Sequence, residues 1–190
     1  MKKRITVNLG ISALLFAAYL LVYLLNSEQI TFFPFFETAG TLLLIAIFFH
    51  RVESLYYLSL VGFAAIAQFG GTMLSLYDVF PAYDIILHFA SGILLLFAGH
   101  YILERLTGRT AGLNLPRGLI LFHCWLFSVA AAGVWEIFEF SVDQLLGFDS
   151  QLNSLVDTMT DIIAGTCGAI IGIFLLWLFL CKRHPKKETN

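Results

Sequence analysis

Acidic side chains recur at helical spacing in the second half of this chain. Glu136, Glu139 and Asp143 follow one another at i, i+3 and i+7, and Asp157 and Asp161 are four residues apart. Residues at these spacings share one face of a helix. They lie at the end of one hydrophobic segment and the start of the next, where ionised groups are costly to place in a membrane. A cluster of acids in that position indicates a functional site.

A histidine joins these acids from another hydrophobic segment, which opens with Asp84 and His88 four residues apart. Carboxylate oxygens with an imidazole suit Mg²⁺, Mn²⁺ or Zn²⁺, and such groups on facing helices build the metal sites of helical bundles. The candidate ligands of a divalent metal are Asp84, His88, Glu136, Glu139, Asp157 and Asp161. Among them His88, Glu136 and Asp161 are the candidate catalytic residues.

Each candidate also has a structural explanation. Asp84 and Asp157 fall in first helical turns, where an acid satisfies free N–H groups and faces the positive end of the helix dipole. Glu136 and Glu139 fall in last turns, where the dipole disfavours anions, so solvation at the rim is their alternative. Asp143 is expected to be a solvated loop residue, and His88 alone would be a packing histidine hydrogen-bonded to a neighbouring helix.

The composition places these residues in a membrane protein. Hydrophobic residues make up 59% of the 190 and charged residues 13%, about half the charged share of a soluble domain, and the mean hydropathy is +0.85. The net charge of -2 leaves no basic face for nucleic acid. Cys124, Cys167 and Cys181 have no metal-type spacing and are expected to be small core residues.

The hydrophobic segments predict an all-α protein of about six transmembrane helices, in a single domain that covers residues 1–190. The expected helices are about 7–25, 30–49, 55–77, 83–103, 119–140 and 156–180. The second is the weakest prediction, because Pro34 and Glu37 interrupt it, and a short or re-entrant helix is the alternative. The lipid bilayer is therefore an expected partner, and the oligomeric state stays open.

The basic residues predict the orientation. With the N-terminus inside, every one of the 11 Lys and Arg residues falls on the cytoplasmic side, as the positive-inside bias requires. We therefore expect a multi-pass protein of the bacterial inner (plasma) membrane with both termini in the cytoplasm. In that topology the candidate site residues of three helices reach one layer near the outer surface. Gly168 and Gly172 form a GxxxG run that would press the sixth helix against a neighbour.

Several of these positions form a longer pattern. The chain reads Asp84-x-x-x-His88-Phe89-x-x-Gly92, then Glu136-x-x-Glu139, then Asp157-x-x-x-Asp161, with Gly168-Ala169-x-x-Gly172 after it. This pattern resembles the VanZ-like and the related YjdF-like families of bacterial membrane proteins over the last three helices. Ile85 stands where VanZ-like sequences usually carry lysine, and the aspartate pair looks more like the YjdF-like side. The resemblance implies a role in the cell envelope, since VanZ is associated with low-level resistance to teicoplanin.

Three functions are compatible with the sequence. The first is an enzyme that acts on a lipid or lipid-linked envelope precursor, with a divalent metal that polarises a phosphate or activates water and with His88 as an acid or base. The second is a carrier of cations or one coupled to protons, although the halves of the chain show no inverted repeat. The third is a non-catalytic protein whose acidic layer binds a cationic ligand, drug or partner.

Overall fold

The computed structural model describes residues 2–25, 32–73, 75–108, 115–147, 150–152 and 154–183. These residues form helices and turns, without strands, and five of the helices are long and apolar enough to cross a membrane. The predicted class of all-helical, polytopic membrane protein is thereby confirmed. The chain divides into two compact units, Met1–Tyr83 and Asp84–Asn190, and each is described by itself. The expected single domain stays a prediction.

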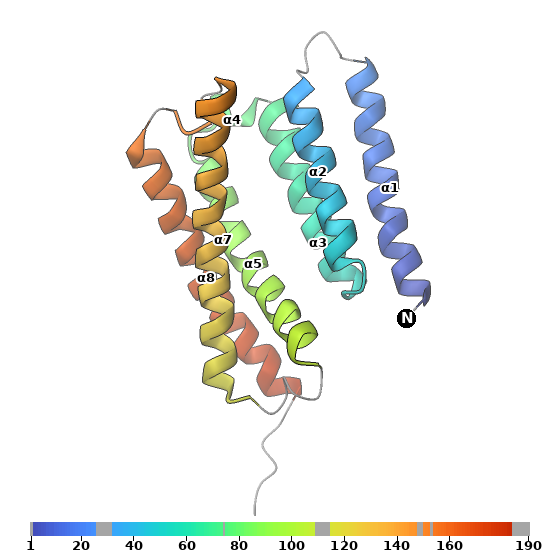
Figure 1. The fold of residues 1–190 in the computed structure, drawn as a ribbon, viewed down its shortest axis with the longest axis vertical. Helices are drawn as coiled ribbons and strands as arrows, with labels where there is room; N and C mark the ends of the chain where they lie inside the picture. The colour runs from blue at the N-terminus through green and yellow to red at the C-terminus, as the bar shows by residue number, and fades with distance from the viewer. Residues whose placement is uncertain are drawn as a thin grey trace, which may run out of the picture. The chain divides into compact units, whose positions relative to one another are not determined.

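Unit 1 contains α1 (Lys2–Leu25), α2 (Phe32–Phe49) and α3 (Ser54–Ala65), which run side by side (Figure 1). The apolar part of α2, Phe35–Phe49, is shorter than the other candidate spans, in agreement with the weak prediction for this segment. The buried side chain of Asn8 on α1 donates hydrogen bonds to the backbone carbonyls of His50 and Val52, at 3.1 and 3.0 Å. This amide ties α1 to the turn between α2 and α3.

The third helix ends earlier than predicted. A π-helix, η1 (Ile66–Met73), continues α3, and Ser75 then adopts a left-handed backbone with φ of 52° before the short helix α4 (Leu76–Val79). The predicted end near Tyr77 falls in α4, beyond this break. Hydropathy continues past the end of the helix because Leu76 is apolar, but the ring of Tyr77 folds back over Gly71, where an added Cβ would overlap it.

Unit 2 consists of α5 (Tyr83–Thr107), α7 (Arg117–Leu146) and α8 (Leu155–Arg183), drawn from green to red in Figure 1. All three are longer than predicted, and α7 includes Asp143, which the sequence analysis placed in a loop. The helix ends where Gly147 takes a φ of 74° and donates its N–H to the carbonyl of Asp143, the left-handed termination that glycine permits. Polar residues lower the hydropathy before that point without ending the helix.

Glycines bring α5 and α8 into backbone contact. A Cβ added to Gly92 would overlap the carbonyl of Gly165, and a Cβ added to Gly168 would overlap the carbonyl of Phe89. The predicted role of the GxxxG run in close packing is thus confirmed. The α7 helix is attached to the same place, because the buried hydroxyl of Ser128 donates to the carbonyl of Gly92 at 2.8 Å.

Candidate functional site

Three helix termini of unit 2 form the candidate site. The α5 and α8 helices begin at one end of the unit, and α7 ends there. His88 lies one turn before Gly92 on α5, and Asp161 lies one turn before Gly165 on α8. Because Gly92 meets Gly165 through backbone atoms, the next turns of both helices are also close together. The glycine contact therefore places His88 beside Asp161.

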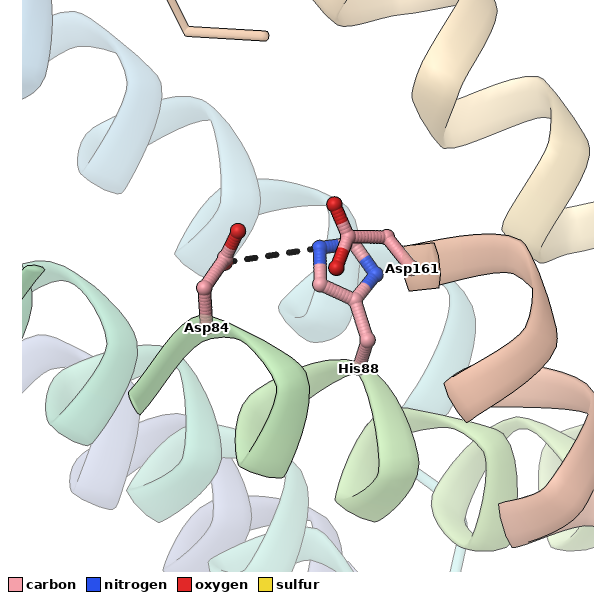
Figure 2. A group of neighbouring side chains, drawn as sticks. All are labelled: Asp84, His88 and Asp161. Carbon is pink, nitrogen blue, oxygen red and sulfur yellow. Dashed lines mark ion pairs between the residues drawn. The ribbon is translucent and has the colours of Figure 1, made fainter. Parts of the chain in front are cut away.

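Asp84, His88 and Asp161 form a compact group that could hold a metal ion. One ligand atom from each residue lies within 4.8 Å of the other two. His88 and Asp161 are buried, at 8% and 2% exposure, while the side chain of Asp84 is 36% exposed. Figure 2 shows the three side chains pointing toward one another, two from α5 and one from α8. His88 Nε2 lies 3.5 Å from Asp84 Oδ1.

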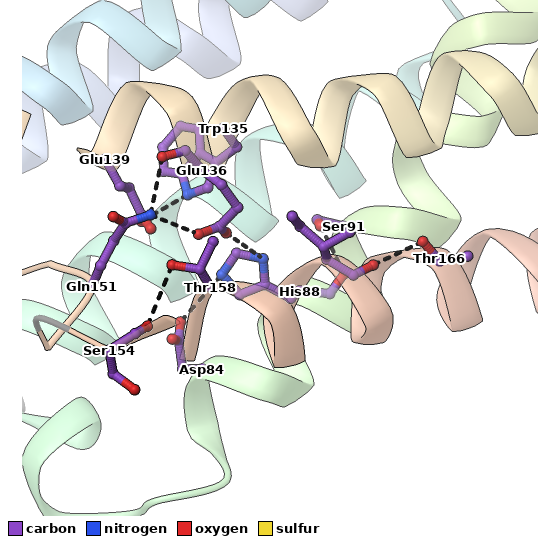
Figure 3. A network of polar contacts seen from close by, with 11 residues as sticks. Asp84, His88, Ser91, Trp135, Glu136, Glu139, Gln151, Ser154, Thr158 and Thr166 are labelled. Carbon is purple, nitrogen blue, oxygen red and sulfur yellow. Dashed lines mark hydrogen bonds and ion pairs between the residues drawn. The ribbon is translucent and has the colours of Figure 1, made fainter. Parts of the chain in front are cut away.

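Glu136 on α7 faces the other nitrogen of the same imidazole. Its Oε1 lies 3.8 Å from His88 Nδ1, within ion-pair range but too long for a hydrogen bond. Glu136 is only 3% exposed, and Oε1 is buried without a hydrogen-bond partner. The other oxygen, Oε2, accepts a hydrogen bond from Gln151 Nε2 at 3.1 Å (Figure 3). Solvation at the rim, the alternative explanation for Glu136, does not apply to a buried side chain.

Gln151 lies in the loop between α7 and α8. Its hydrogen bonds with Asp143 and Glu136 of α7 form a clasp that the sequence analysis missed. Asp143 accepts backbone hydrogen bonds from Ser150 at 2.9 Å and from Gln151 at 3.0 Å. The Gln151 side chain then reaches back to Glu136 and is 8% exposed. Asp143 is thus a helix residue that holds the loop. The i, i+7 spacing of Asp143 from Glu136 could have indicated that Asp143 belongs to the site. No spacing rule identifies a single glutamine such as Gln151 in a short polar loop.

Besides Glu136, two more of the predicted metal ligands are outside the three-residue group of Asp84, His88 and Asp161. Glu139 accepts a hydrogen bond at 2.8 Å from the indole nitrogen of Trp135, one turn earlier on the same helix (Figure 3). Asp157 is the third residue of α8, and its backbone N–H donates to the hydroxyl of Ser154 at 3.3 Å. Ser154 and Asp157 have the spacing of a capping box. The position of Asp157 therefore fits the start of the helix, which was the structural alternative.

The charges of unit 2 are segregated along its helices. Asp84, Glu136 and Asp161 surround His88 at the site end. The basic residues of the described part of unit 2 lie at the opposite end of the helices: Arg105 in the last turns of α5, Arg117 at the start of α7, and Lys182 and Arg183 at the end of α8. Of the charged side chains in these helices, only His88 can offset the acids at the site end. The other ways to offset these acids are protonation, the positive N-terminal ends of α5 and α8, and a bound cation.

An apolar core separates the site from the basic end of unit 2. The buried side chains of Leu96, Cys124, Ala169 and Leu176 form its centre, with Ile120 and Leu180 beside them. Leu96, Cys124, Ala169 and Leu176 have no exposed surface. Within the described residues of this unit, the polar groups of the site therefore end at a packed hydrophobic layer.

These features define a multi-pass helical membrane protein with a buried cluster of acids around a histidine. The model of the family described as "Predicted membrane protein (DUF2238)" matches residues 8–182, and the chain belongs to this family. No curated protein matches the chain, and no solved structure does.

Proposed function

We propose that this protein binds a divalent metal ion through Asp84, His88 and Asp161 and uses it for chemistry on a lipid or lipid-linked precursor of the cell envelope. The observation that carries the proposal is the convergence of three ligand atoms within 4.8 Å, with two of the three residues buried. Buried acids persist where a partner offsets their charge. A metal ion meets that need for Asp161 without help from any Lys or Arg.

The ligand set favours Zn²⁺ or Mn²⁺ over Mg²⁺. Two carboxylates with an imidazole suit zinc and manganese, whereas magnesium prefers oxygen ligands and retains its waters. Ligands in a tetrahedral zinc site lie about 3.3 Å apart, close to the 3.5 Å between His88 Nε2 and Asp84 Oδ1. Three protein ligands leave a position for water or substrate, as in catalytic zinc sites. A metal there would activate that water or polarise a phosphate oxygen.

A lipid-linked substrate follows from the surroundings of the site. The site lies at the ends of helices that are long enough to cross a membrane. The positive-inside bias favours the outer surface of a bacterial inner membrane for this end of the helices. Both termini then lie in the cytoplasm. The resemblance to VanZ-like and YjdF-like proteins supports a role in the envelope. Since no Lys or Arg among the described residues of unit 2 is at this end, the metal would be the group that attracts a phosphate.

The two other functions fit less well. A carrier needs a polar path through the membrane, but the polar groups of the site end at the apolar core around Leu96 and Leu176. A protein that only binds a cationic ligand needs accessible acids, whereas Asp161 and Glu136 are 2% and 3% exposed. Buried carboxylates around an imidazole suit a small, desolvated cation better than a large one.

Metal analysis of the purified full-length protein tests the proposal. We expect stoichiometric zinc or manganese after dialysis against a weak chelator, and we expect Asp161→Asn to lose it while the variant keeps its helical circular dichroism. Thr160→Ala is the matched control, because the Thr160 hydroxyl donates to the carbonyl of Val156 on its own helix. A wild-type protein without metal that refuses added Zn²⁺ and Mn²⁺ would overturn the proposal. Cation uptake by proteoliposomes would instead favour the carrier.

A further inference from the structure

The imidazole of His88 lies between two carboxylates that approach different nitrogens. Asp84 Oδ1 is 3.5 Å from Nε2, and Glu136 Oε1 is 3.8 Å from Nδ1. A neutral imidazole carries a proton on one nitrogen and a lone pair on the other. If Nε2 is to bind a metal beside Asp84, the proton must be on Nδ1, and Nδ1 then needs an acceptor. The buried Oε1 of Glu136, which has no hydrogen-bond partner, is placed to be that acceptor.

Gln151 fixes which end of Glu136 is available. Its Nε2 donates to the backbone carbonyl of Glu136 at 3.0 Å as well as to Oε2 at 3.1 Å. A backbone carbonyl only accepts hydrogen bonds, so the amide of Gln151 has to present its NH₂ group to Glu136. Asp143 holds the backbone N–H of Gln151 at 3.0 Å. Gln151 is therefore held both at its backbone and at its side-chain amide. Oε1 is the oxygen of Glu136 that is left to face His88.

We infer that Glu136 is a positioning residue that sets the tautomer of His88, with Gln151 orienting Glu136. This inference rests on the proposed metal site, in which His88 would bind through Nε2. A carboxylate that accepts the second N–H of a metal-bound histidine orients the ring and strengthens it as a ligand. Glu136 accordingly acts through His88, although the sequence analysis included it among the metal ligands. Nδ1 and Oε1 have to approach by about 1 Å to form the bond, and catalytic hydrogen bonds often tighten in this way when the ligand is bound.

Glu136→Gln reverses the polarity of this contact with almost no change in shape. The NH₂ group of Gln151 would donate a hydrogen bond to the amide oxygen of the new glutamine, as it donates to Glu136 Oε2 in the wild type. The new amide NH₂ group must then face His88 Nδ1, which becomes an acceptor, and the proton moves to Nε2. We therefore expect Glu136→Gln to invert the tautomer and to weaken Zn²⁺ binding by about 10- to 100-fold, the usual effect of losing such a partner.

A second substitution provides the rescue. In Glu136→Gln combined with Gln151→Ala, nothing holds the new amide in one orientation, so its oxygen can rotate to face Nδ1. We expect the double variant to regain the original tautomer and most of the Zn²⁺ affinity. Ser141→Ala is the control on the same helix, because the Ser141 hydroxyl donates only to the carbonyl of Ile137 at 2.6 Å. A merely structural role for Glu136 predicts further damage from the double change.

The measurement is ¹⁵N NMR of histidine-labelled, detergent-solubilised full-length protein, together with Zn²⁺ affinity by chelator competition. The His88 signals are assigned by their loss in His88→Gln. Metal-free spectra are recorded over a pH series that reaches the neutral imidazole. Because Asp84 competes for the proton from the Nε2 side, we expect a larger fraction of His88 protonated at Nδ1 in the wild type than in Glu136→Gln, and a recovery of that fraction in the double variant.

Two results would overturn the inference: a wild-type protein with no detectable fraction protonated at Nδ1, or a Glu136→Gln variant with the same Nδ1-protonated fraction as the wild type. The first of these depends on the wild type alone, so the test does not require the variants to fold. A wild type that binds no Zn²⁺ defeats the proposed metal site, while the metal-free spectra still decide what Glu136 does. The two failures are therefore distinguishable.

Discussion

Replacing Gly92 with alanine should damage both the packing of unit 2 and its site. A Cβ on Gly92 would overlap the carbonyl oxygen of Gly165 and come within 2.9 Å of that carbonyl carbon and 3.0 Å of the nitrogen of Ala169. All three are backbone atoms, which no side-chain rotation can move. The α5 and α8 helices have to separate to admit the methyl group.

The cost follows from two opposing terms. Overpacking costs about 1–3 kcal/mol of stability. Because the added methyl group of Gly92→Ala meets backbone on the facing helix, we expect a cost at the upper end of this range, about 3 kcal/mol. Alanine recovers about 1 kcal/mol over glycine inside a helix, so the expected net loss is about 2 kcal/mol. Gly133→Ala on α7 is the matched control, since its Cβ would meet nothing within 4 Å. It should gain up to about 1 kcal/mol from helix propensity.

The same substitution should also weaken metal binding. Relief of the overlap moves the two helices apart by about 1 Å, one turn from His88 and Asp161, whereas metal–ligand distances are specified to about 0.2 Å. Thermal unfolding in detergent and Zn²⁺ competition measure the two effects. A Gly92→Ala protein that matches Gly133→Ala in both stability and affinity would refute the reasoning.

Two further changes test other parts of the structure. Asn8→Ala should cost about 2 kcal/mol in thermal unfolding, because two carbonyls of the α2–α3 turn lose the buried amide that binds them; a loss no larger than that of Gly10→Ala, where a Cβ meets nothing within 4 Å, would contradict this. Asp157→Asn should cost at most about 1 kcal/mol, through the helix dipole, and should leave the metal content unchanged; loss of metal as in Asp161→Asn would make Asp157 a ligand.

Much of the fold could be predicted from the sequence because membrane insertion depends on local properties. Apolar length indicated the helices, and Pro34 and Glu37 indicated that the second would be short. The helix ends were less accurate, since polar residues such as Asp143 lower hydropathy without stopping a helix. Actual stops depend on single backbone conformations, such as the positive φ of Gly147 and of Ser75. A glycine such as Gly147 indicates that conformation in a sequence, whereas a serine such as Ser75 does not.

The sequence alone also determined the level of each candidate residue along its helix, because every residue advances an α-helix by a constant rise. That was enough to place His88, Glu136 and Asp161 at one end of their helices. The direction in which each side chain points depends on how the helices rotate and pack, which the backbone contact of Gly92 with Gly165 and the clasp of Gln151 decide. For that reason only the tertiary structure could separate Asp161, which meets His88, from Asp157, four residues earlier, at the helix start.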